Sequence, residues 1–179
     1  MTSEGALYGQ SLYDLATEED LTDQLLEELE MVKGIFAENP DYIRLLSEPS
    51  IPRQERLKLV DDAMRGQVHP YLLNFLKIML ENDLLRDFGA SCRRYRDSYN
   101  KAHGITEAVV TSAVPLTREE AAQLTDKLVQ ITGRKVLLTQ RVDESVLGGL
   151  RVEADGMLMD GTVTGRLRDI RRKVSEVVI

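Results

Sequence analysis

The sequence YNKAHGITEAVVTSAVP, residues 99–115, contains the point at which the spacing of the apolar residues changes. Before it, apolar side chains recur every three or four positions, which places them on single helix faces. His103 and Gly104 form a helix-ending signal. After them, residues 106–114 are rich in β-branched side chains, which favours a strand. The charge composition shifts at the same point, so we predict two domains, 1–104 and 105–179.

The first domain is predicted to be an all-α bundle of six helices with short connections. Thr2 or Ser3 can cap the first helix. Asn39 is predicted to cap the third helix, which opens with Pro40. Gly66 is predicted to end the fourth in the left-handed conformation. The expected helices are residues 3–16, 19–38, 40–46, 53–65, 70–82 and 86–102.

The fifth predicted helix is apolar around nearly its whole circumference. A helix of this kind is buried on most sides. In so small a domain, it must either lie at the centre of the bundle or leave one side for a partner. Its apolar residues are Leu72, Leu73, Phe75, Leu76, Ile78, Met79 and Leu80.

The second domain is predicted to be a small α+β domain in the order β-α-β-β-β-α, with its helices covering one face of a sheet. Thr117 and Glu120 form a capping box that begins its first helix, and Gly133 ends that helix. A strand is expected over 135–142, and a hairpin over 150–159. The last helix has an apolar stripe of Leu167, Ile170, Val174 and Val177.

The net charge of −7 lies entirely in the first domain, where residues 1–104 hold 19 acids and 12 bases. The second domain is neutral. This charge distribution argues against electrostatic binding of nucleic acid or anionic lipid by the chain as a whole. No signal peptide and no membrane-spanning segment is expected. The single cysteine, Cys92, excludes an internal disulfide and fits a reducing compartment.

Signals of catalysis are weak throughout the sequence, so we expect no catalytic residue, no cofactor and no metal. Gly148 and Gly149 are not followed by the Lys and hydroxyl of a phosphate loop, and are expected to let strands approach or bend. Asp155 and Asp160 each precede a glycine, where Asp hydrogen-bonds its own backbone in a turn. Cys92 is expected to pack in the core.

Binding is therefore the predicted type of function. An amphipathic helix of another chain could dock beside the apolar fifth helix. Five bases fall within eight residues of the last helix and form a candidate partner surface: Arg166, Arg168, Arg171, Arg172 and Lys173.

Two other functions fit parts of the sequence. One is an RNA-binding helical module with a basic C-terminal helix, which a steep salt dependence of RNA affinity would support. The acidic first domain argues against it. The other is a small metal-dependent hydrolase using Asp155 and Asp160, which metal-stimulated turnover would support.

Several motifs together resemble the δ subunit family of F-type ATP synthases, bacterial relatives of the mitochondrial oligomycin-sensitivity-conferring protein. The resemblance departs at Gly9 and Gln10, where residues with better helix propensity are common, and at Thr162, where Ser is usual. The motifs are YGQSLYDLA (8–16), NFLKIMLEN (74–82), TSAVPLT (111–117), VDESVLGGLRV (142–152), DG (155–156) and DGTV (160–163).

The resemblance implies a non-catalytic stator subunit, which links the α3β3 catalytic head to the b-subunit peripheral stalk so that ion-driven rotation is coupled to ATP synthesis. It would lie at the cytoplasmic face of the bacterial plasma membrane, without inserting into it and without binding nucleic acid. The C-terminal region of b would meet residues 105–179, on the basic last helix.

In the family, the N-terminal helix of an α subunit binds in a groove between the first and fifth helices. We therefore expect Leu12→Asp or Ile78→Asp to weaken binding of the head while the protein stays folded. Carried over to this sequence, the groove residues are Tyr8, Ser11, Leu12, Leu15, Phe75, Ile78, Met79 and Asn82.

Overall fold

The computed structural model describes residues 4–146, 148–154 and 156–162. The chain divides into two compact units between Tyr99 and Asn100. This division lies five residues before Gly104, inside the last helix of the helical part. Asn100 belongs to the second unit, and its Nδ2 donates to Glu107 Oε1 of the same unit at 2.9 Å. The two units are described separately below.

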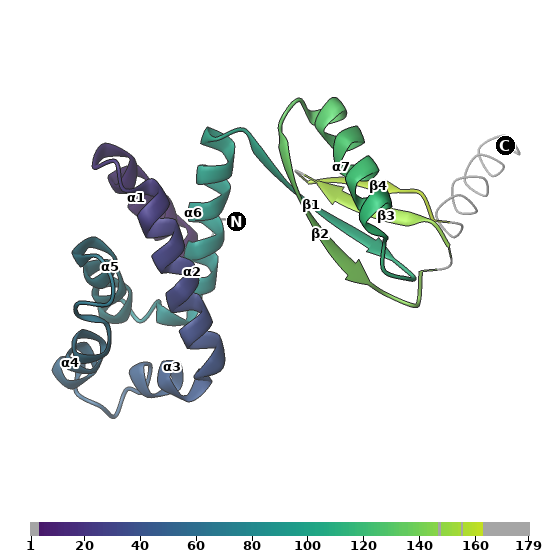
Figure 1. Ribbon diagram of the computed structural model, residues 1–179. Coiled ribbons are helices and arrows are strands. Elements are labelled where there is room, and N and C mark those ends of the chain that lie inside the picture. Colours follow the sequence, from purple (N-terminus) through teal and green to yellow (C-terminus); the bar gives the residue numbers. More distant parts are fainter. Residues whose placement is uncertain (1–3, 147, 155, 163–179) are drawn as a thin grey trace, which may run out of the picture. The chain divides into compact units, whose positions relative to one another are not determined.

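The first unit is helical, and the prediction of a helical N-terminal part is confirmed (Figure 1). A 3₁₀ turn, η1, precedes the last helix and was not predicted. The elements are α1 Glu4–Glu18, α2 Thr22–Glu38, α3 Pro40–Leu46, α4 Arg53–Met64, α5 Pro70–Glu81, η1 Leu85–Asp87 and α6 Phe88–Ala102.

Every one of these helices contributes buried apolar side chains to a single core. Aromatic rings join distant parts of it: Tyr13 and Tyr95 pack edge to face at 5.3 Å between α1 and α6. Phe36 and Phe88 do the same between α2 and α6 at 5.2 Å. Edge-to-face packing stabilises such pairs beyond the burial of their area. Cys92 lies in this core, as predicted.

Two predicted helix caps differ in the structure. Asn39 makes no capping bond to α3; its Nδ2 donates back to the carbonyl oxygen of Ile35 at 2.9 Å and so closes α2. Gly66 has the predicted left-handed backbone, with φ +76°, but α4 already ends at Met64 and Arg65 is extended. The predicted first-helix caps, Thr2 and Ser3, lie outside the described residues.

The apolar circumference of α5 is explained mostly by its position in the core. Six of its seven apolar residues from Leu72 to Leu80 are buried. Ile78 alone among them is exposed, at 44%. The excess of apolar residues is therefore weaker support for a partner than the sequence suggested.

The second unit contains a four-stranded sheet in the order β2-β1-β3-β4 (Figure 1). β1 pairs in parallel with β2 and antiparallel with β3, which pairs antiparallel with β4. The predicted order is confirmed as far as β4; the predicted last helix lies outside the described residues. The elements are β1 Ile105–Ser112, α7 Arg118–Thr132, β2 Lys135–Val142, β3 Leu150–Ala154 and β4 Met157–Asp160.

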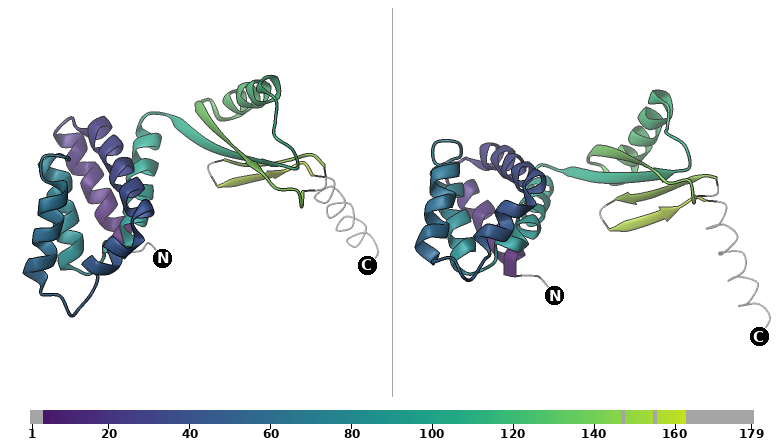
Figure 2. Two further views of the ribbon diagram at one scale, coloured as in Figure 1. Left: turned by 60° about the horizontal axis from the view of Figure 1, so that its bottom comes forward. Right: turned by 90° about the horizontal axis from the view of Figure 1, so that it is seen from below.

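Helix α7 covers one face of the sheet (Figure 2). Leu128 of α7 packs there with Ala108, Val110, Val136 and Val152 of three strands. The predicted capping box is present, because Thr117 Oγ1 accepts from Glu120 N–H and Glu120 Oε2 accepts from Thr117 N–H. Gly133 ends α7 with φ +67°, as predicted.

Candidate functional site

The predicted partner site lies on two helices that contact each other, α1 and α5. One side chain fixes their contact: Ser91 Oγ of α6 lies 2.6 Å from the carbonyl oxygen of Gly5 and 3.7 Å from Met79 Sδ. Helix α1 therefore lies on the Met79 side of α5. Lys77, on another side of α5, reaches Asp61 of α4. Ile78 of α5 and Asn82, which follows the helix, are both exposed.

The eight predicted groove residues divide into surface and core. Ser11, Ile78 and Asn82 are exposed, and Tyr8 and Leu15 are half-buried. The other three are core residues, with exposures of 4% for Leu12, 6% for Phe75 and 0% for Met79. The burial of Leu12 argues against the expectation that Leu12→Asp leaves the protein folded, because an unpaired carboxylate would replace a buried leucine.

Two residues at this surface were missed by the sequence reasoning. Tyr71 is half-buried and lies four positions before Phe75 and seven before Ile78, so it shares their stripe on α5. Leu7 of α1 is 59% exposed. The periodicity of Tyr71 was the available signal. We call the accessible residues Leu7, Tyr8, Ser11, Leu15, Tyr71, Ile78 and Asn82 the α1–α5 face.

Contacts at both ends hold α5 in place. At its start, His69 Nδ1 accepts a bond from the backbone N–H of Tyr71 at 3.3 Å, and the backbone N–H of His69 donates to Glu28 Oε2 at 2.7 Å. After its end, the buried Arg56 donates from Nη1 to Asp83 Oδ1 at 3.4 Å. Asp83 has a positive φ of 56°. These bonds position the stripe that carries Tyr71.

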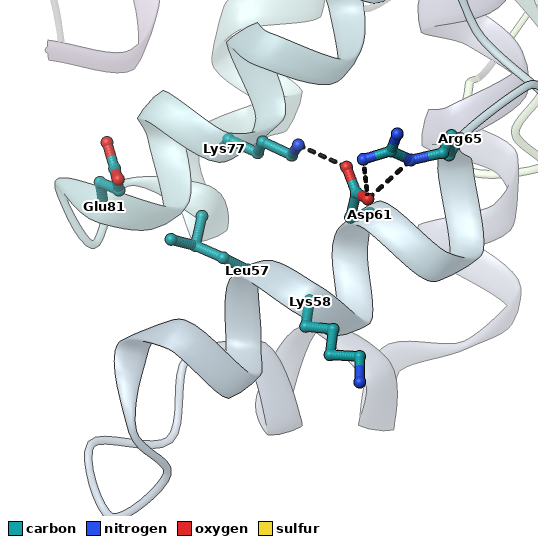
Figure 3. Close-up of a pocket in the computed structure, with 6 residues that line it drawn as sticks. All are labelled: Leu57, Lys58, Asp61, Arg65, Lys77 and Glu81. Atoms are coloured by element: carbon teal, nitrogen blue, oxygen red, sulfur yellow. Dashed lines mark hydrogen bonds and ion pairs between the residues drawn. The ribbon is translucent and has the colours of Figure 1, made fainter.

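A hollow between α4 and α5 is lined by both signs of charge (Figure 3). Lys77 and Arg65 both reach Asp61, with Arg65 Nε 2.7 Å from Asp61 Oδ2, whereas Lys58 points away from it. Hydrogen bonds from Lys77 and then Arg65 lower the pKa of Asp61. Asp61, Arg65 and Lys77 therefore neutralise one another, and the Lys77–Asp61 pair ties α5 to α4.

The other residues considered for chemistry have structural roles. Asp160 Oδ1 accepts from Thr162 N–H at 3.1 Å, which is the predicted turn; Asp155 lies outside the described residues. A Cβ on Gly149 would lie 2.4 Å from the carbonyl oxygen of Gly161, which confirms the close approach predicted there. Burial raises the pKa of the Cys92 thiol to about 12, which disfavours the thiolate.

The part of the chain that the structure describes holds neither a cluster of metal ligands nor a membrane-spanning helix. Within it, no three His, Cys, Asp or Glu side chains are grouped to hold a metal. None of its helices is long and apolar enough to cross a bilayer. The predicted basic surface, Arg166, Arg168, Arg171, Arg172 and Lys173, lies outside the described residues.

Residues 6–174 match the family model described as "ATP synthase delta (OSCP) subunit". The chain belongs to this family. The ATP synthase subunit delta of Myxococcus xanthus is 33% identical over 172 residues, which cover 94% of each chain. That of Symbiobacterium thermophilum is 33% identical over 168 residues, covering 93% of this chain and 90% of the relative. That of Clostridioides difficile is 30% identical, with 96% and 95% covered.

The fold of this delta-family chain also occurs in a solved structure. A chain of the Toxoplasma gondii mitochondrial ATP synthase hexamer superposes with a TM-score of 0.76 at 16% identity, covering 96% of this chain and 97% of that one. At this identity the likeness concerns the fold alone. Family membership makes the chain a delta-type subunit of an F-type ATP synthase, a component of the peripheral stalk.

Proposed function

We propose that this chain joins the catalytic head of an F-type ATP synthase to its peripheral stalk and supplies no catalytic group of its own. The family match over residues 6–174 carries the proposal, because it spans both units. Ion flow turns a rotor inside the head, and a head that is not held turns with it. A subunit that holds the head still needs interfaces that dissociate slowly, which well-packed apolar anchors provide better than rim charges.

The proposed contact with the head is the α1–α5 face, with the N-terminal helix of an α subunit as its partner. Ile78 supports this placement, because it is an isoleucine left 44% exposed beside half-buried Tyr8, Leu15 and Tyr71. Leu12, Phe75 and Met79 form the core directly beneath the face and shape it from below. A helix that lays an apolar stripe on such a face uses anchors spaced three and four residues apart.

The test is a calorimetric titration of the full chain with a peptide of the N-terminal segment of the α subunit from the same synthase. One-to-one binding is expected. Ile78→Asp is expected to weaken it by about a hundredfold, because a carboxylate would be buried against apolar groups. Met31→Asp is the matched control: Met31 is 42% exposed on α2, and its variant is expected to bind as the original does.

The result that contradicts this placement is equal affinity of the original and a folded Ile78→Asp variant. Far-ultraviolet circular dichroism and a thermal melt establish that each variant is folded. If Met31→Asp weakens binding as much as Ile78→Asp does, the effect is one of added charge and not of the α1–α5 face.

The proposed contact with the stalk lies in residues 105–179, with the C-terminal region of the b subunit as partner. The bases from Arg166 to Lys173 are the proposed residues. Among the described residues, the sheet face opposite α7 also leaves Leu137 and Leu158 exposed. Binding of a b-subunit fragment should be lost in Arg171→Glu with Arg172→Glu and kept in Leu158→Asp. The reverse result would move the contact to the sheet.

The site of action follows from this assignment. A subunit bound to the head and to the stalk would be held at the cytoplasmic face of the bacterial plasma membrane as a peripheral component. Fractionation of cells should recover the chain with membranes, and release of the catalytic head from them should release the chain with it.

A further inference from the structure

We propose that the segment that docks on the α1–α5 face is a basic amphipathic helix, which carries Lys or Arg on both flanks of its apolar stripe. This inference rests on the proposed function, because it specifies the chemistry of the same partner. It goes beyond it by stating which charges that partner must bring.

The apolar part of the face requires the stripe. Ile78 and Leu7 are exposed at 44% and 59%, and Tyr8, Leu15 and Tyr71 are half-buried at the edge of the core. These side chains keep apolar area in contact with water in the free protein. Covering that area drives association, but it does not select among partner helices.

The charges of α1 and α5 determine which partner helices can bind favourably. Helix α1 carries Glu4, Asp14 and Glu18 and no base along its whole length. Helix α5 carries Glu81 and a single base, Lys77, which is ion-paired with Asp61 of α4. All four acids are exposed. The two helices that bear the face thus present acidic side chains to a partner, and their single basic side chain is already ion-paired within the protein.

The placement of these acids is unfavourable in the free protein. Glu18 and Glu81 are the last residues of α1 and α5, and neither helix has a base in its last turn. A carboxylate at a helix C-terminus is repelled by the negative end of the helix dipole. Asp14 and Glu18 are also like charges four positions apart, which repel each other.

A cationic partner removes these costs when it binds. Lys or Arg placed beside Glu18 and Glu81 would pair with them and offset the two helix dipoles at once. A partner without bases would leave both repulsions in place, and an acidic partner would increase them. Charge complementarity of this kind raises the association rate and discriminates against wrong partners.

The experiment uses the full chain and two synthetic peptides. One is the N-terminal segment of the α subunit from the same synthase. The other is the same peptide with every Lys and Arg replaced by Gln. Each is titrated into the original chain and into Glu18→Gln/Glu81→Gln, at low and at high NaCl.

The matched control is Glu38→Gln/Asp62→Asn. Glu38 is the exposed last residue of α2, also without a base in its last turn, and Asp62 is exposed on α4. The control therefore removes the same net charge, and relieves one helix C-terminus, away from the α1–α5 face.

At low salt, Glu18→Gln/Glu81→Gln is expected to weaken binding of the native peptide by roughly fivefold to tenfold, and the control to leave it unchanged. The difference should shrink at high salt, because salt screens exposed charges. The Gln peptide should bind the original chain more weakly than the native peptide does. Its affinity for the two double variants should equal its affinity for the original chain.

Three results would overturn the inference. Equal affinity of the original chain and Glu18→Gln/Glu81→Gln for the native peptide at low salt overturns the charge requirement alone. So does a native segment that binds but carries no Lys or Arg. If neither peptide binds the folded chain, the proposed contact with the head fails, and the inference fails with it.

Discussion

A Cβ atom built on Gly9 would lie 2.3 Å from the carbonyl oxygen of Ser91, so α1 and α6 meet backbone to backbone at this point. One turn earlier, Ser91 Oγ donates to the carbonyl oxygen of Gly5 at 2.6 Å. At the next residue of α1, Gln10 Oε1 accepts a bond from Ser98 Oγ, two turns further along α6, at 2.7 Å. Gly9 and Gln10 depart from the family pattern in helix propensity, and these contacts give the reason: both serve the α1–α6 contact.

Gly9→Ala is expected to destabilise the first unit by about 1–3 kcal/mol, because a methyl group has no room against the Ser91 backbone. Gly34→Ala is the matched control, since nothing lies within 4 Å of a Cβ there and Gly34 is also inside a helix. That variant should gain about 0.5–1 kcal/mol from helix propensity. Urea denaturation measures both, and equal effects would contradict the close contact.

Leu12→Ala is expected to lower the free energy of unfolding by about 2–5 kcal/mol, because it removes a buried side chain and leaves a cavity. Leu7→Ala, on the exposed side of the same helix, should change it by less than about 0.5 kcal/mol. Chemical denaturation followed by helical circular dichroism distinguishes them. A folded, fully stable Leu12→Ala would place Leu12 in the docking face and not in the core.

The Asp61 cluster predicts a dependence of stability on acid pH. The pKa of Asp61 lies below its ordinary value of 3.8 because Lys77 and Arg65 donate to the carboxylate. A group of this kind stabilises the fold above its ordinary pKa, and the contribution is lost as pH falls through the lowered pKa. Asp61→Asn should therefore be less stable at neutral pH and lose less stability on acidification than the original chain.

Asp62→Asn is the control for that measurement, because Asp62 is exposed one position further along α4. Its unfolding curve should change with pH as that of the original chain does. If Asp61→Asn and the original chain lose stability in parallel below about pH 4, other carboxyl groups are responsible for the acid dependence.

Thr117→Ala should weaken the start of α7 by about 0.5–2 kcal/mol, because it removes the acceptor for the Glu120 N–H. The Glu120 carboxylate also loses its bond from the Thr117 hydroxyl, at 2.8 Å. The backbone N–H of Thr117 and then its hydroxyl lower the pKa of Glu120, so loss of the hydroxyl alone should raise that pKa part of the way toward its ordinary value. Thr125→Ala is the control within α7, since Thr125 Oγ1 bonds only back to Ala121. Hydrogen exchange of the first α7 amides measures the difference.

Features set by neighbours in sequence could be predicted. The capping box of Thr117 and Glu120, the glycine stop at Gly133 and the strand over 135–142 all depend on residues a few positions apart. Asn39 shows the limit of local rules. As a cap of α3, Asn39 would accept a bond at Oδ1 from a backbone N–H of that helix. In the structure its Nδ2 instead donates to the carbonyl oxygen of Ile35, in the last turn of α2.

The candidate site was less predictable because burial depends on residues distant in sequence. Leu12, Phe75 and Met79 have the same apolar character as Ile78, yet they lie in one core with buried side chains of η1 and α6, whereas Ile78 is exposed. The sequence near residue 75 does not indicate which side of α5 will be covered by η1 and α6, which come later in the chain. Tyr71 was missed for the opposite reason: its spacing from Ile78 was visible, but a half-buried tyrosine is also an ordinary core residue.

The position of β1 has a mechanical consequence. It follows α6 after only His103 and Gly104, and it is an interior strand, bonded to β2 on one side and to β3 on the other. A pull on the chain from the helical unit enters the sheet along β1. Both ladders of hydrogen bonds then resist in shear, together, and cannot open one bond at a time as those of an edge strand can. The spatial order of the strands thus attaches the connection between the two units to a strand that is held against tension from both sides.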